Sequence, residues 1–159
     1  VGGAIFHDGN LLPGDAFRCG EAGHMTLIPG GRPCYCGKTG CVDSYCSARV
    51  LSDLSGGRLK DFFRELQQNN REYRPVWDTY LKHLAVVINN LHMILDYDIV
   101  LGGYVGSFLT PWLDTIRHLV SERNTFEDDG SFVKLCTYQT GAAAYGVAMD
   151  VMEGFLRTV

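Results

Sequence analysis

The sequence has 159 residues, of which 46% are hydrophobic and 20% charged, a composition typical of a chain that folds around its own core. The net charge of -4 and the pI near 5.7 exclude a broad basic surface for nucleic acid. No segment approaches the roughly 20 apolar residues of a membrane span, and the first residues lack a signal-peptide layout. We therefore expect one cytoplasmic domain over residues 1–159, without a membrane partner.

The first residues predict a β-hairpin. Apolar residues 4–6 and 11–12 flank an Asp8-Gly9 pair, and Asp-Gly favours a tight hairpin turn because Gly tolerates positive φ. Val1 has no Met before it, so we expect the chain to be part of a longer protein.

Residues 13–41 are rich in Gly, Pro and Cys and show little periodicity, which predicts an irregular segment that needs a brace. Helical patterns follow from about Ser44, with a break at residues 55–57. The remaining elements are predicted as helices over 59–68, 76–96, 108–123 and 141–156, and strands over 99–101 and 132–136. The strand at 99–101 is wholly apolar, which predicts that it is buried. This order of strands and helices indicates an α/β layered domain.

A cluster of cysteines carries the most specific chemistry. Cys34, Cys36 and Cys41 are closely spaced, and His24 lies ten residues before the first of them. In a reducing compartment such spacing favours a metal over a disulfide, and one His with three Cys is a ligand set that tetrahedral zinc prefers. Four protein ligands leave no position for a reactive water, so we expect a structural zinc. The alternative is buried thiols or a redox pair.

The other cysteines, and four further histidines, show no such clustering. We interpret them as ordinary core or surface side chains: Cys19, Cys46, Cys136, His7, His83, His92 and His118.

Two motifs in this region resemble the signature of the ROK family of sugar kinases and sugar-sensing repressors. Residues 20–24 read Gly-Glu-Ala-Gly-His, and residues 34–43 read Cys-Tyr-Cys-Gly-Lys-Thr-Gly-Cys-Val-Asp. The opening hairpin and the segment Ile-Val-Leu-Gly-Gly at 99–103 also match family segments, so the resemblance spans nearly the whole chain. It implies an actin-like ATPase (ribonuclease H-like) fold, of which this chain is the second lobe, with a zinc-braced loop at about residues 20–43.

The resemblance also implies sugar-binding roles for Glu21, His24 and Asp43. A carboxylate can accept hydrogen bonds from two vicinal sugar hydroxyls, and a zinc-bound His would have its second ring nitrogen oriented by the metal. The alternatives are that Glu21 is a solvated loop residue and that Asp43 caps the helix after it. Family members usually have Glu where Asp43 stands, so contact there is weaker or passes through water.

Gly102 and Gly103 follow a predicted strand, where ligands gather in open α/β sheets, and the resemblance suggests that they contact a nucleotide. A tight turn that requires glycine explains them equally well. Tyr104 stands where the family commonly has another Gly, which would narrow an adenine pocket.

The resemblance places the general-base Asp of the kinases upstream of Val1, so residues 1–159 alone should be inactive. Asp43 and Tyr104 depart from the kinase pattern, and a sensor tolerates such drift better than a catalyst does. The first hypothesis is therefore a transcriptional regulator that reaches DNA through a missing amino-terminal domain. The alternative is an ATP- and magnesium-dependent hexose kinase resembling glucokinase, and a third option is a zinc-braced interaction domain without a ligand. A homo-oligomer is expected, with Phe62, Phe63 and Trp112 as candidate interface residues.

Overall fold

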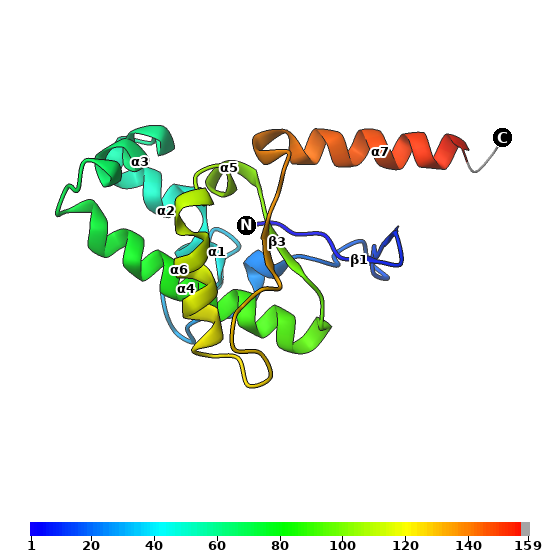
Figure 1. Ribbon diagram of the computed structural model, residues 1–159, viewed down its shortest axis with the longest axis horizontal. Coiled ribbons are helices and arrows are strands. Elements are labelled where there is room, and N and C mark those ends of the chain that lie inside the picture. The colour runs from blue at the N-terminus through cyan, green and yellow to red at the C-terminus, as the bar shows by residue number, and fades with distance from the viewer. Residues whose placement is uncertain (157–159) are drawn as a thin grey trace. The chain divides into compact units, whose positions relative to one another are not determined.

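The computed structural model describes residues 1–156, which form two compact units. The first unit comprises residues 1–87 and the second begins at residue 88, so helix α4 (Tyr73–Leu95) contributes to both. Figure 1 traces the elements in chain order by colour. None of the helices among residues 1–156 is long and apolar enough to cross a membrane.

The first unit begins with the predicted hairpin. Strands β1 (Phe6–His7) and β2 (Asn10–Leu11) pair antiparallel. Asp8 and Gly9 between them have φ of 49° and 74°, as a two-residue type I′ turn requires. The sequence prediction is confirmed here, because the turn is specified by two adjacent residues.

Helices form the remainder of the first unit, after an irregular segment. They are the 3-10 helix η1 (Ala22–His24), α1 (Asp43–Cys46), α2 (Ala48–Ser52), η2 (Asp53–Ser55), α3 (Leu59–Gln67) and the first part of α4. The predicted break at residues 55–57 is present, and Gly56 ends η2 in the left-handed conformation. Pro75 lies in the first turn of α4, where its missing N–H leaves no hydrogen bond unmade.

An aromatic cluster makes the core of this unit. Trp77 is fully buried, with its ring stacked on Tyr80 at 5.4 Å and in edge contact with Phe63 at 5.2 Å. Phe62 is also fully buried beside Tyr73. The suggestion that Phe62 and Phe63 belong to a subunit interface is therefore wrong, because the apolar face of α3 is turned inward against α4.

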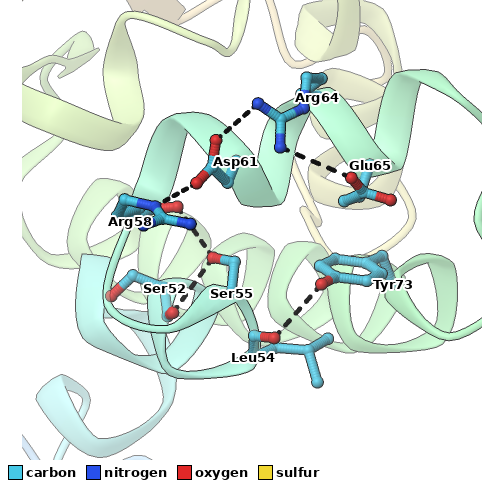
Figure 2. A network of polar contacts seen from close by, with 8 residues as sticks. All are labelled: Ser52, Leu54, Ser55, Arg58, Asp61, Arg64, Glu65 and Tyr73. Atoms are coloured by element: carbon cyan, nitrogen blue, oxygen red, sulfur yellow. Dashed lines mark hydrogen bonds and ion pairs between the residues drawn. The ribbon is translucent and has the colours of Figure 1, made fainter.

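Polar contacts join η2 to α3 and, separately, η2 to the start of α4 (Figure 2). Asp61 pairs with Arg58 and, at 2.8 Å, with Arg64. The Tyr73 hydroxyl donates to the carbonyl oxygen of Leu54 at 3.2 Å. The contact between Tyr73 and Leu54 thus ties the backbone of η2 to the first turn of α4.

The second unit has a parallel pair of strands with helices between them. Its elements after α4 are β3 (Ile99–Leu101), α5 (Gly103–Gly106), η3 (Thr110–Trp112), α6 (Leu113–Ser121), β4 (Val133–Leu135), η4 (Gln139–Gly141) and α7 (Ala142–Leu156). Ile99 pairs with Val133 and Leu101 with Leu135. The predicted helix over 108–123 is thus a 3-10 turn followed by α6.

Strand β3 is only partly buried, which corrects the sequence prediction. Val100 is 59% exposed, whereas Ile99 and Leu101 are half-buried. Successive side chains of a strand point to opposite faces of the sheet, so Val100 projects from the face opposite to its neighbours. An apolar run alone does not show which of its faces is covered.

His92 is a buried histidine whose ring nitrogens both have partners in the second unit. It is 8% exposed and stacks on Phe132. Its Nε2 lies 2.9 Å from the Glu127 carboxylate, and its Nδ1 lies 2.8 Å from the carbonyl oxygen of Tyr97. This agrees with the interpretation of His92 as a satisfied core residue.

Replacing His92 by Ala should lower the free energy of unfolding by about 3 kcal/mol, because a hydrogen bond to Tyr97, the contact with Glu127 and a ring contact are lost together. Urea denaturation of the intact protein measures this change. His118→Ala is the matched control, since His118 is 74% exposed and pairs with Glu122 only across 3.7 Å. Equal losses for the two variants would contradict a structural role for His92.

Candidate functional site

The first unit brings four potential metal ligands together. The ligand atoms of His24, Cys34, Cys36 and Cys41 all lie within 4.8 Å of one another. The sulfurs of Cys36 and Cys41 are 3.7 Å apart. In a tetrahedral zinc site with Zn–S bonds of about 2.3 Å, two sulfurs are separated by about 3.8 Å. The donor types and their spacing therefore fit a zinc ion.

Short backbone contacts close the loop around these thiols. Residues Thr26 and Cys41 form an isolated β-bridge, and Pro33 and Thr39 form another. The N–H of Cys34 donates to the carbonyl oxygen of Lys38 at 2.8 Å. Two bridges and a tight turn thus replace regular secondary structure in this segment.

Gly37 and Gly40 both have positive φ, 84° and 80°, but their surroundings differ. A Cβ at Gly37 would meet open space, whereas a Cβ at Gly40 would overlap the carbonyl oxygen of Ile28. Gly40 is therefore required by packing as well as by conformation.

Gly40→Ala should lower the free energy of unfolding by roughly 3 kcal/mol or more and reduce the metal content, while Gly37→Ala should cost only about 1 kcal/mol of backbone strain. Thermal denaturation together with metal analysis of both variants tests this difference. Equal effects of the two substitutions would show that the contact with Ile28 is unimportant.

The thiols differ in their affinity for protons. The pKa of Cys34 is lowered to about 7, chiefly because the backbone N–H of Cys36 donates to its sulfur. Burial, followed by the neighbouring thiols Cys34 and Cys36, raises the pKa of Cys41 to about 11. One thiolate thus forms readily, and each further one is opposed by the charge already present. A divalent cation would relieve that repulsion, as it does in zinc–thiolate sites.

The residues with sugar-binding roles by resemblance lie beside this cluster. Glu21 is exposed at the position before η1, and His24 ends that turn. Asp43 is the first residue of α1, whose N-cap is Val42 without any side-chain cap bond. The interpretation of Asp43 as a helix cap is therefore wrong.

Tyr35 is a member of this site that the sequence interpretation missed. Its hydroxyl lies 3.1 Å from Nε2 of His24, and the two rings meet edge to face at 5.3 Å. Desolvation, followed by the negative charges of Asp43, Cys34 and Glu21, raises the pKa of Tyr35. Both carboxylates thus act on this one hydroxyl. Its position in the sequence, between the candidate ligands Cys34 and Cys36, was the signal that could have identified it.

Gly102 and Gly103 lie in the second unit, directly after β3. Gly102 caps α5, and a Cβ there would approach the Cβ of Cys136 at 3.1 Å. Gly103 has φ of 71° and open space around its Cα. Both a tight turn and close approach of a ligand are consistent with this geometry, and both readily select glycine.

The family model of the ROK family matches residues 1–152, and the chain belongs to this family. It is 55% identical over 169 aligned residues to a glucokinase of Halalkalibacterium halodurans, covering 92% of this chain and 51% of that protein. It is 31% identical over 112 residues to an N-acetylmannosamine kinase of Escherichia fergusonii, covering 67% and 38%. The chain thus spans about half the length, or less, of these relatives.

Solved ROK structures share the fold. A Streptococcus pneumoniae ROK protein in complex with sucrose matches with a TM-score of 0.77 at 20% identity, over 98% of this chain and 56% of that one. A Streptomyces griseus glucokinase in complex with glucose and AMPPNP gives 0.72 at 20% identity, over 89% and 54%. A transcriptional regulator homologous to the Escherichia coli MLC protein gives 0.67 at 20% identity, over 84% and 38%. These neighbours imply the actin-like ATPase fold, and because they include a kinase and a regulator, the fold alone does not separate the two functions.

Proposed function

We propose that this chain is the sugar-binding second lobe of an ATP-dependent ROK hexose kinase of the glucokinase type. The 55% identity to a glucokinase over 92% of the chain carries this proposal. It reverses the preference for a regulator that Asp43 and Tyr104 suggested, because two departures from a motif weigh less than identity over nearly the whole chain. The protein is then a cytoplasmic homo-oligomer that needs ATP with magnesium and a sugar.

Each site residue has a role that its chemistry supports. Glu21 has an exposed carboxylate that can accept hydrogen bonds from two hydroxyls of one hexose. His24 would hold zinc together with the three cysteines, and the metal would supply rigidity to the loop but no catalysis. Asp43 would contact the sugar from the start of α1, directly or through water. Gly102 and Gly103 would let the backbone approach a nucleotide.

Tyr35 fits a positioning role in this proposal. Its hydroxyl can fix the ring of His24 from the side of Nε2, so that the orientation of the imidazole depends on two partners. We expect Tyr35→Phe to raise the KM for sugar roughly five- to tenfold, about 1 kcal/mol, with little change in zinc content. Sugar titrations and metal analysis of the variant measure both effects. A loss of zinc in the same variant would instead make Tyr35 part of the metal loop's structure.

Phosphorylation assays of the intact protein test the proposed activity. Glucose, mannose, N-acetylglucosamine and N-acetylmannosamine are supplied with magnesium–ATP, and sugar-induced thermal shifts are recorded alongside. We expect turnover with glucose. A sugar-dependent shift without turnover would support the regulator instead, and DNA binding would then be measured. If neither turnover nor a sugar-dependent shift is observed, the remaining hypothesis is a zinc-braced interaction domain without a ligand.

A further inference from the structure

A groove in the first unit has no place in the sugar chemistry above. It has a volume of about 570 Å³, which is within the range of small-ligand sites. It lies between the loop that carries the metal ligands (about residues 20–43) with α1, the end of α2 with η2, and one face of α4. The residues that line it are Arg32, Tyr45, Val50, Asp53, Leu54, Pro75, Val76, Thr79, Tyr80 and His83. Neither Glu21 nor Asp43 is among them.

The walls of the groove are apolar and well anchored. Val50 and Leu54 line it from α2 and η2, and Pro75 and Val76 line it from α4. The Leu54 carbonyl oxygen is held by the Tyr73 hydroxyl at 3.2 Å, within the network of Figure 2. The buried Tyr80 hydroxyl donates to the carbonyl oxygen of Cys46 at 2.8 Å. A groove with both sides tied down in this way needs little reorganisation to accept a ligand.

Arg32 supplies a positive charge to this groove. Its guanidinium carbon lies 5.0 Å from the ring centroid of Tyr45, and its backbone N–H donates to the Tyr45 hydroxyl at 2.7 Å. The carbonyl oxygen of Arg32 accepts from the N–H of Gly40 at 2.8 Å. The side chain is therefore positioned by its ring contact and by a backbone fixed on both sides.

This charge has no carboxylate partner within the described residues 1–156. The ion pairs there, those of 4.0 Å or less, do not include Arg32. Asp53 also lines the groove, but it pairs with Arg49 at 3.7 Å. The guanidinium donates to the carbonyl oxygen of Ser44 across 3.5 Å, which is a long and therefore weak hydrogen bond. A fork of N–H donors is thus available to an incoming acid.

His83 adds an uncharged polar group at the same place. Its ring meets Tyr45 edge to face at 4.9 Å. Burial, followed by the charge of Arg32, lowers the pKa of His83, so the imidazole is neutral at neutral pH. A neutral imidazole can donate or accept one hydrogen bond without adding a second positive charge.

We propose that this groove binds a small organic anion, whose acidic group is held by Arg32 and whose apolar body packs against Leu54 and Val76. The acid is a carboxylate or a phosphate monoester, since the guanidinium fork suits both. The site is separate from the proposed sugar site and does not depend on the kinase activity being correct.

Probe anions titrated into the intact protein test the site. Phenyl phosphate and benzoate combine an acid with an apolar body. Inorganic phosphate supplies only the acid, and phenol supplies only the apolar ring without the acid. The ring-proton NMR signals of His83, assigned by comparison with His83→Gln, report binding in the groove, and calorimetry gives the affinity. We expect at least one of the two combined probes to saturate the protein with one equivalent per chain, more tightly than either half. The combined probe that binds more tightly shows whether the site prefers a phosphate monoester or a carboxylate.

Two substitutions and a control separate the contributions. Arg32→Gln should weaken binding of the combined probe at least tenfold, and Val76→Trp should block the groove while leaving Arg32 in place. Lys60→Gln removes an exposed charge outside the groove and should leave the affinity unchanged. Circular dichroism checks that each variant is folded. If Arg32→Gln does not fold, Val76→Trp still tests whether the anion binds in the groove.

Three results would overturn the proposal. The first is no saturation of the His83 signals by either combined probe up to about 10 mM, which is weaker than ordinary ligand sites. The second is phenol binding as tightly as phenyl phosphate, with no effect of Arg32→Gln, which would make the groove a purely apolar surface. The third is Val76→Trp changing the oligomeric state while no anion binds, which would make it a contact between copies of the chain.

Discussion

Cys36→Ser should reduce the zinc content of the intact protein from about one equivalent per chain to less than about a tenth. Cys36 is the exposed cysteine of the cluster, so its replacement removes a ligand without opening a cavity in the core. Zinc binding is worth roughly 10 to 16 kcal/mol in small zinc peptides, and losing even part of that should lower the thermal midpoint by more than about 10 °C. Metal analysis and thermal denaturation of protein purified without added zinc measure both quantities.

Cys19→Ser is the matched control, because Cys19 lies outside the cluster at intermediate exposure. It should retain the zinc and most of the stability. A wild-type protein with less than about half an equivalent of zinc, and with no loss of stability on chelation, would return the thiols to the alternative of buried or redox-active cysteines.

Glu21→Gln should lower kcat/KM for the preferred sugar by about 10²- to 10³-fold, which is roughly 3 to 4 kcal/mol. The substitution keeps the shape of the side chain but removes the charge that strengthens two hydrogen bonds to the sugar. Steady-state kinetics on the intact protein measures the change. If the protein is a sensor, the same substitution should abolish the sugar-induced thermal shift instead.

Asp15→Asn provides the comparison, since Asp15 is an exposed acid outside the site. It should leave both sugar readouts unchanged, while zinc content should stay the same in both variants. Unchanged sugar kinetics in Glu21→Gln would show that Glu21 is a solvated loop residue, the alternative that the sequence left open.

Local signals in the sequence predicted most of the elements. The turn at Asp8 and Gly9, the break at Gly56 and the long periodic helix α4 were all found where the sequence indicated. Each of these features depends on residues that are adjacent in the chain or one helical turn apart. The errors came where a partner element decides the outcome, as for Val100, whose exposure depends on which face of β3 is covered.

The sequence by itself indicated the family and the candidate metal-ligand set, because the family motifs and the spacing of His24 and the three cysteines lie in short segments that are visible in the chain. It also showed Glu21 and Asp43 as candidates by resemblance. Only the tertiary structure decided that Tyr35 contacts His24, and that Arg32 and His83, 51 residues apart in number, face one groove beside Tyr45. Such contacts depend on how a loop packs against a distant helix, and no local pattern of residues specifies that packing.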